Sequence, residues 1–176
     1  QRQRCIRDRD YAKALAGLAA RTDAVDETTY WSYSAYSSQV EEAELHRTWL
    51  AGEPAVAPSP VTQAYTNFLL ASVFVDDYVV GAAAVLPCYW LYAQTGAQIT
   101  RIPDEHPYAA WLHTYHDDEF VQATAQALAI VERAFALAAP QARSRAARAY
   151  LTACRHEMEF FDQALRVDPD DPGCDE

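Results

Sequence analysis

The chain contains 176 residues, enough for one compact domain with a substantial core. Hydrophobic residues make up 51% of the sequence and charged residues 22%, which is the composition of a globular protein. The net charge is −11 at pH 7 and no basic stripe is visible, so neither nucleic acid nor an anionic membrane is expected as a partner.

The hydrophobic pattern is helical along nearly the whole chain, and the sequence has only five glycines and no Asn-Gly hairpin signal. Ser59 is a good N-cap, and Pro60 follows it at the first helical position. Gly52 and Gly96 are placed as helix stops. The predicted helices span about 8–21, 28–50, 60–74, 76–94, 106–115, 117–139 and 141–166.

These elements predict one all-α domain over residues 1–166. An acidic tail that mixes proline, glycine and aspartate follows over 167–176 and is expected to be disordered. The apolar run 79–92 is too short to span a membrane, and no secretory signal is visible. The four cysteines form no C-x-x-C pair, so we expect reduced thiols in a cytoplasmic protein.

The fourth predicted helix carries a proline and a cysteine inside the apolar stretch AAAVLPCYWLY. Pro87 removes a backbone donor and clashes with the carbonyl four residues back, at a cost of roughly 3 kcal/mol, so we expect a bend there. Gly81 and the following alanines are small enough for another element to approach. Tyr92 lies one turn beyond Cys88 on the same side. A bend, a thiol and a phenol together indicate a pocket wall, whereas the alternative is an inert buried cysteine.

The last predicted helix carries a glutamate on its apolar face. A single stripe with spacings of 4, 3, 4 and 4 contains Tyr150, Cys154, Glu157, Phe161 and Leu165. A desolvated carboxyl group has a raised pKa, which suits a general acid. Alternatively, Glu157 is structural and pairs with an arginine or with tyrosine hydroxyls.

Polar aromatic residues are unusually frequent, with eleven tyrosines in the chain. Asp8 and Tyr11 share one face of the first helix, Tyr65 lies in the middle of the third, and Tyr115 ends the short helix. Because buried tyrosines usually make hydrogen bonds, these residues either hold helices together or line a cavity for a flat heterocycle. No E-x-x-H, G-x-S-x-G or phosphate-binding glycine loop occurs, so no metal or other cofactor is expected.

Five segments occur in the order and at the distances found in one known family. They are D-x-x-Y at 8–11, AYTNFLL at 64–70, LPCYWLY at 86–92, HPYAAWLHTY at 106–115 and E-x-x-F-F at 157–161. On these segments the chain resembles TenA, or thiaminase II, in its cysteine-containing branch. The resemblance extends from Asp8 to Leu165, and the LPC-x-W-x-Y block is its most specific part.

The resemblance implies a haem-oxygenase-like helical bundle without haem, assembled as a homotetramer. It also implies hydrolysis of 4-amino-5-aminomethyl-2-methylpyrimidine to the 5-hydroxymethyl compound and ammonia, which salvages degraded thiamin. The same chemistry can split thiamin into pyrimidine and thiazole. The implied partners are therefore an aminopyrimidine or thiamin and further copies of the chain.

The resemblance assigns a role to each residue that matches a family motif. Cys88 matches the nucleophile and Glu157 the acid/base, while Asp8 matches the aspartate that holds the aminopyrimidine edge. The aromatic matches are Tyr65 and Tyr115 beside the nucleophile and the ring, Tyr11 packed on the pyrimidine, and Tyr92 on the pocket wall.

Two features depart from the family pattern. Family chains carry further helices before the D-x-x-Y segment, whereas this sequence begins at Gln1, so we expect a truncated chain or an altered pocket wall. The segment VDDYVVG at 75–81 lacks the usual glycine before the fourth helix and the usual glutamate near Val80. This difference would alter assembly or the size of the leaving group.

Two other functions stay open on the sequence alone. One is a non-catalytic protein that uses the same fold to bind a pyrimidine or a partner protein. The other is a different haem-oxygenase-like enzyme, such as a cofactor-free or iron oxidase, although the lack of clustered metal ligands argues against iron.

Overall fold

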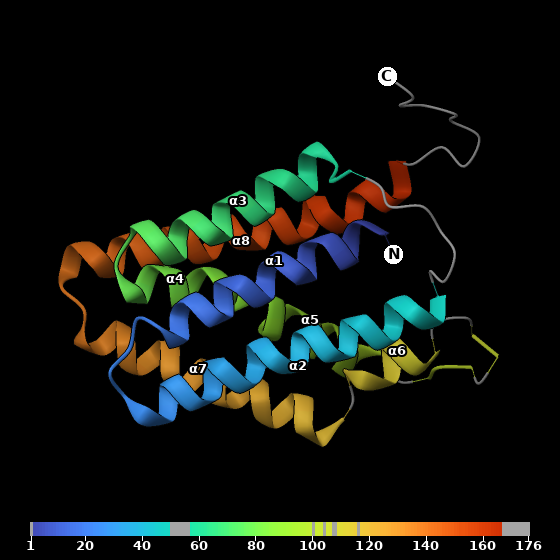
Figure 1. The fold of residues 1–176 in the computed structure, drawn as a ribbon, viewed down its shortest axis with the longest axis horizontal. Coiled ribbons are helices and arrows are strands. Elements are labelled where there is room, and N and C mark those ends of the chain that lie inside the picture. The colour runs from blue at the N-terminus through green and yellow to red at the C-terminus, as the bar shows by residue number, and fades with distance from the viewer. Residues whose placement is uncertain are drawn as a thin grey trace.

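The computed structural model describes residues 2–49, 57–99, 101–103, 105–106, 109–115 and 117–166. Within these ranges the chain forms helices and turns and contains no strand, which confirms the all-α prediction. The helices are α1 (Arg2–Ala19), α2 (Val25–Trp49), α3 (Pro60–Val75), α4 (Tyr78–Val85), α5 (Pro87–Gln98), α6 (Ala109–Thr114), α7 (Asp118–Leu137) and α8 (Pro140–Arg166) (Figure 1). The predicted stop at Gly52 and the predicted tail at 167–176 lie outside the described residues.

Two helix starts follow from their capping residues, as the sequence predicts. The Ser59 hydroxyl accepts the backbone N–H of Thr62 at 3.1 Å, and Pro60 opens α3. The Asp117 carboxylate likewise accepts the backbone N–H of Glu119 at 2.8 Å at the start of α7. These caps satisfy donors that the first helical turn leaves without a partner.

Other predicted boundaries were wrong. α1 begins at Arg2, because the residues before position 8 contain no helix breaker. α2 begins at Val25, which places two acidic residues in its first turn at the positive end of the helix dipole. α5 does not close at Gly96. A Cβ atom there would lie 2.8 Å from the Cβ atom of Tyr115, so this glycine allows close packing.

The central element of the bundle is α4. Residues 79–85 are all buried, and the helix packs against α1, α3, α7 and α8. A helix that is apolar on every side belongs in a core. A Cβ atom at Gly81 would lie 2.9 Å from the Cα atom of Val73, which confirms that the small residues of this segment allow another helix to approach.

The predicted bend at Pro87 divides the fourth predicted helix into α4 and α5. Leu86 keeps helical dihedral angles (φ −59°, ψ −37°), and its carbonyl accepts the N–H groups of both Tyr89 and Trp90 at 3.0 Å. The Val85 carbonyl instead accepts the Tyr11 hydroxyl at 2.9 Å. Tyr11 therefore stabilises the break that sets the direction of α5.

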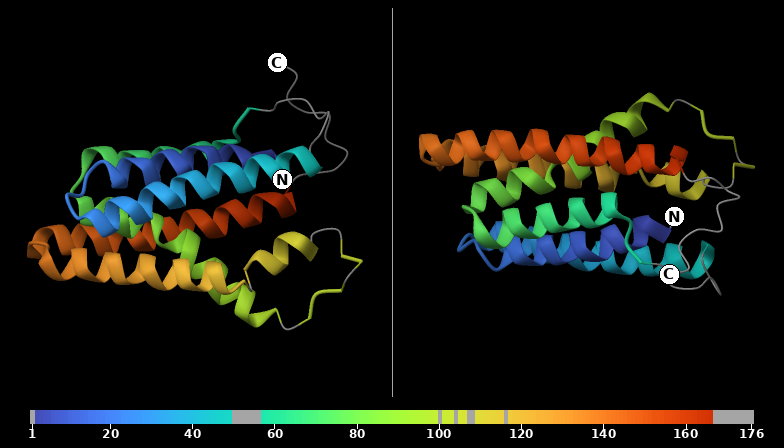
Figure 2. Two further views of the ribbon diagram at one scale, coloured as in Figure 1. Left: turned by 60° about the horizontal axis from the view of Figure 1, so that its bottom comes forward. Right: turned by 90° about the horizontal axis from the view of Figure 1, so that it is seen from above.

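The remaining helices surround this bent pair. α1 packs against α2 and α3, and α3 packs against α8; Figure 1 shows α1, α3 and α8 side by side along the long axis. α5 turns away from the axis of α4 and runs toward the end of the molecule where α6 lies (Figure 2). It packs against α7 and α8. None of the described helices is both long and apolar enough to cross a lipid bilayer.

Candidate active site

Glu157 is the most deeply buried acidic side chain among the described residues, with 1% of its surface exposed. It lies on the inner face of α8, as the sequence predicts, but the rest of the predicted stripe was partly wrong. Phe161 and Leu165 are 47% and 86% exposed. The buried face instead carries alanines and one phenylalanine: Ala142, Ala146, Ala149, Ala153 and Phe160. These small residues let α8 pack closely against the central helix.

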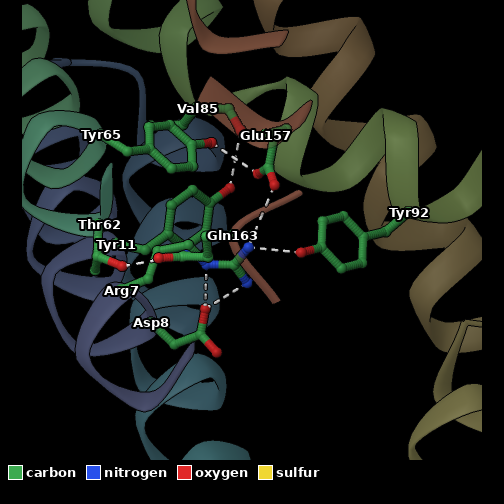
Figure 3. Close-up of polar contacts among 9 residues, drawn as sticks. All are labelled: Arg7, Asp8, Tyr11, Thr62, Tyr65, Val85, Tyr92, Glu157 and Gln163. Carbon is green, nitrogen blue, oxygen red and sulfur yellow. Dashed lines mark hydrogen bonds and ion pairs between the residues drawn. The ribbon is translucent and has the colours of Figure 1, made fainter. Parts of the chain in front are cut away.

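Two side chains from other helices bind the Glu157 carboxylate (Figure 3). The Tyr65 hydroxyl, from the middle of α3, donates to Oε1 at 2.7 Å. Nη1 of Arg7, from α1, donates to Oε2 at 3.3 Å. These are the arginine and tyrosine partners that the structural alternative for Glu157 requires, so burial and pairing alone do not decide its role.

Cys88 is a further neighbour of this carboxylate. The thiol lies in the first turn of α5, directly after Pro87, and the Glu157 carboxylate is close enough to influence its pKa. Burial raises the pKa of Cys88 well above its ordinary value; Arg7 acts in the opposite direction, and the charges of Glu157 and Asp8 raise the pKa further. The cysteine nevertheless keeps partial solvent exposure. The geometry therefore places a thiol that is protonated near neutral pH beside a carboxylate that can accept its proton.

Arg7 joins the carboxylates of two helices. Its Nε and Nη2 atoms donate to Oδ1 of Asp8 at 2.8 and 2.6 Å, and Nη1 also donates to the Tyr92 hydroxyl at 2.5 Å (Figure 3). The guanidinium lies over the Phe160 ring, 4.6 Å from its centroid. Burial lowers the pKa of Arg7, but Asp8 and the other acidic partners more than offset this, and the pKa is raised overall. A buried positive charge thus stands between two carboxylates.

The sequence did not lead us to Arg7, although a signal was present. The spacing of Tyr11, Leu15 and Leu18 places them on one apolar stripe of the first helix, and Arg7 lies one further turn back along that stripe. Its side chain is indeed buried, with 2% of the residue exposed. Charged residues are almost never fully buried without a partner, so a charge on a core stripe should have been followed as closely in α1 as in α8.

The predicted tyrosines contact different parts of the site. Burial, together with neighbouring charge, raises the pKa values of Tyr65 and Tyr92, so both phenols are donors near neutral pH. The Tyr11 hydroxyl binds the Val85 carbonyl at the helix break. Tyr115 meets the site through the ring of Tyr92, with ring centroids 5.0 Å apart. Arg7 therefore joins Asp8, Tyr92 and Glu157, while Tyr65 and Cys88 adjoin Glu157. We call these six residues the thiol cluster.

Two cavities are lined in part by α5. One of about 180 Å³ adjoins Tyr92 and is lined by Leu91, Tyr92, Thr95, Gly96, Ile99, Leu112, Tyr115 and Phe161. A larger and more polar cavity of about 540 Å³ has walls from α2, α5, α6 and α7, including Tyr30, Ser34, Tyr89, His113 and Phe120. In the part of the chain that the structure describes, no three histidine, cysteine or acidic residues are grouped as metal ligands would be.

Fold and site together define an all-helical protein with a cysteine and a glutamate paired in its interior. Residues 9–167 match the TENA/THI-4/PQQC family, and the chain therefore belongs to that family. The resemblance found in the sequence is confirmed at this level.

Similar proteins agree with this assignment. The chain is 51% identical over 163 residues to the thiamine biosynthesis multifunctional protein ThiED of Corynebacterium efficiens, covering 90% of this chain and 22% of that protein. It is 27% identical to the aminopyrimidine aminohydrolase of Halalkalibacterium halodurans, covering 88% of this chain and 74% of that protein. The crystal structure of a TenA family transcription regulator from Silicibacter sp. TM1040 has the same fold, with a TM-score of 0.83 at 21% identity over 94% of this chain and 80% of that one. The chain thus spans about a fifth of the length of the Corynebacterium protein.

Proposed function

We propose that this chain is a hydrolase of the TenA type, which converts 4-amino-5-aminomethyl-2-methylpyrimidine and water to the 5-hydroxymethyl pyrimidine and ammonia. Family membership supports the proposal, as do the relatives that are named aminopyrimidine aminohydrolases. The observation that carries it is the position of Cys88, directly after Pro87 in α5 and beside the buried Glu157 carboxylate. A perturbed thiol next to a buried carboxylate is typical of a functional site.

The chemistry begins with transfer of the Cys88 proton to Glu157. The thiolate then adds to the electron-poor pyrimidine ring, and a proton returned from Glu157 allows the exocyclic methylene to release ammonia. Water adds to that methylene, and its proton is taken up by the Glu157 carboxylate. Departure of sulfur from the ring as a thiolate restores aromaticity, and the proton held by Glu157 returns to the sulfur to restore the thiol. One water is therefore consumed and one ammonia is released in each cycle.

The remaining thiol-cluster residues would hold the substrate in place. A carboxylate offers several acceptor positions, so Asp8 can accept a charge-assisted hydrogen bond from the pyrimidine amino group while it binds Arg7. Tyr65 keeps Glu157 oriented by its hydrogen bond to Oε1. Tyr92 and Tyr115 form an aromatic wall beside the cluster, and Tyr11 fixes the helix break that presents the thiol. Water is largely excluded there, so each of these polar interactions is stronger than in solvent.

The direct test is to incubate the purified protein with the aminomethylpyrimidine and to measure ammonia and the hydroxymethyl product together. The proposal predicts equal amounts of both, with catalytic turnover. Tight binding of the pyrimidine without ammonia would instead support a non-catalytic binding protein. Release of ammonia by the Cys88→Ser variant at the wild-type rate would remove the nucleophile from the proposal.

Cleavage of thiamin is a second proposed activity, since expulsion of a thiazole follows the same path as expulsion of ammonia. The name of the ThiED relatives places those proteins in thiamine biosynthesis, which favours a thiamin-related substrate here. Assays with thiamin as the substrate would distinguish the two activities. We also propose a cytoplasmic homotetramer, which light scattering of the purified chain would test.

A further inference from the structure

Arg7 offsets part of the negative charge in the thiol cluster. Asp8 and Glu157 supply two carboxylates, and transfer of the Cys88 proton to Glu157 would move one of these negative charges onto the sulfur. Arg7 supplies the one positive charge among the groups that act on the thiol. Uncompensated buried charges are costly, so proton loss from Cys88 depends on this guanidinium.

The contacts of Arg7 also fix the directions of its partners. Its planar fork binds Asp8 through Nε and Nη2 and reaches Tyr92 and Glu157 through Nη1. These partners come from α1, α5 and α8, and the Phe160 ring supports the guanidinium from one side. A lysine would keep the charge but could not make the same fork of donors.

We propose that Arg7 is a positioning residue, whose guanidinium arranges Asp8, Tyr92 and Glu157 around Cys88 and supplies the positive charge that lets the thiol lose its proton. This inference rests on the proposed function, because it assumes that Cys88 is the reactive group. It concerns thiol ionisation rather than turnover, so the two can be tested separately.

The ionisable groups around the thiol come from several helices. Those that act on Cys88 are Arg7, Asp8 and Tyr11 from α1, Tyr65 from α3, Tyr89 and Tyr92 from α5, and Glu157 from α8. The four tyrosines have raised pKa values, because burial disfavours their charged forms, and they stay neutral near pH 7. Of the other helices that pack on α5, α4 carries Tyr78, which binds Glu27, and α7 carries Arg133, which pairs with Asp26 and Glu27. Arg7 is thus opposed by Asp8 and Glu157.

The experiment measures the rate at which iodoacetamide alkylates Cys88 between pH 6 and pH 10.5, with the modified peptide quantified by mass spectrometry. For Arg7→Gln we expect the profile to move to higher pH by about 1–3 units, which makes alkylation about tenfold slower or more at any pH below the midpoint. Arg7→Lys should move the alkylation profile by a smaller amount, because lysine keeps the positive charge. Asp8→Asn should move the profile to lower pH, because a negative charge is lost.

Removing Arg7 alone takes away the guanidinium that bridges the two buried carboxylates of Asp8 and Glu157, so Arg7→Gln can fail to fold. The variant Arg7→Gln/Asp8→Asn removes one charge of each sign, and its comparison with Asp8→Asn isolates the arginine. We expect the double variant to titrate at higher pH than Asp8→Asn. Alkylation of the folded arginine variants at the rate of their parent proteins, at every pH from 6 to 10.5, would overturn the proposal. A shifted profile in a protein that releases no ammonia would contradict only the proposed function.

Discussion

The bundle contains two buried glutamates that bind a tyrosine and an arginine, and their surroundings differ in an instructive way. Glu157 belongs to the thiol cluster. The second set, which we call the Glu27 cluster, consists of Thr22, Glu27, Trp31, Tyr78 and Arg133. Glu27 accepts from Tyr78 at 2.6 Å, from Thr22 at 3.1 Å and from Arg133 at 3.1 Å, and the indole of Trp31 donates to the Tyr78 hydroxyl at 2.8 Å.

The two clusters differ in solvent access and in one reactive atom. The Arg133 side chain is 49% exposed, whereas that of Arg7 is 3% exposed. The ion pair between Arg133 and Glu27 is therefore partly hydrated, and such a pair contributes little beyond local stability. In the thiol cluster, the Arg7 guanidinium is shielded from solvent, and the Cys88 thiol lies beside the Glu157 carboxylate. We propose that similar residue types serve a structural role at one site and support chemistry at the other, and four predictions test this contrast.

The largest expected effect is that of Cys88→Ser on turnover. A hydroxyl is a far weaker nucleophile than a thiolate, so ammonia release should fall by about 10³-fold or more. Cys154→Ser on α8 is the matched control, since that cysteine is also partly buried, and its turnover should match the wild type. Equal losses in both variants, measured by ammonia release, would show that neither cysteine is specific to the chemistry.

The next effect separates the two glutamates. Glu157→Gln keeps the shape of the side chain but cannot accept the thiol proton, so turnover should fall by about 10²–10⁴-fold. Glu27→Gln should leave turnover unchanged and lower the free energy of unfolding by about 1–2 kcal/mol. Parallel assays and urea titrations measure both quantities. If Glu157→Gln has a lower free energy of unfolding but its folded form keeps wild-type turnover, the role of Glu157 is structural.

The tyrosine partners provide a smaller effect. Tyr65→Phe removes a donor from Glu157, and turnover should fall by about tenfold, equivalent to about 1.4 kcal/mol. Tyr78→Phe leaves the Trp31 indole without its acceptor and should cost about 1–3 kcal/mol of stability without affecting turnover. Steady-state rates of the two variants, compared with their thermal unfolding, check this prediction. Similar turnover in the two would contradict the distinction.

The smallest effect concerns stability in alkaline solution. The pKa of Cys88 in the folded protein is raised above its ordinary value of 9.0, mainly by burial, so the folded state holds a proton that the unfolded chain releases. The stabilisation is therefore complete below about pH 9 and is lost progressively as pH rises toward the folded pKa, by at most about 1.4 kcal/mol per pH unit. The free energy of unfolding of Cys88→Ser should fall less steeply with pH over that range, because only the tyrosines then contribute to the pH dependence. Identical slopes would contradict the direction of the shift.

Much of the fold could be predicted because local signals decide it. Ser59 with Pro60 marks a helix start by the chemistry of a single turn, and the apolar run around Gly81 marks a central helix. The errors occurred where tertiary contacts override those signals. Gly96 has the character of a helix stop, yet the helix continues because Tyr115 packs closely against the glycine.

The candidate site shows the same limit. Periodicity placed Glu157 on a buried face, and Pro87 marked Cys88, but neither pattern could bring α5 and α8 together. Arg7 and Asp8 are sequence neighbours, and adjacent residues on a helix do not normally face each other, so their ion pair could not be expected from spacing. The exposure of Phe161 and Leu165 likewise depends on which helices pack against α8.

The most direct test of the central claim is a crystal structure of the protein with 4-amino-5-hydroxymethyl-2-methylpyrimidine bound. If Cys88 and Glu157 form the reactive pair, the pyrimidine ring will lie against the Cys88 sulfur, with its amino group on Asp8. A ring bound instead in the larger cavity beside Tyr30 and Tyr89, away from that sulfur, would contradict the account.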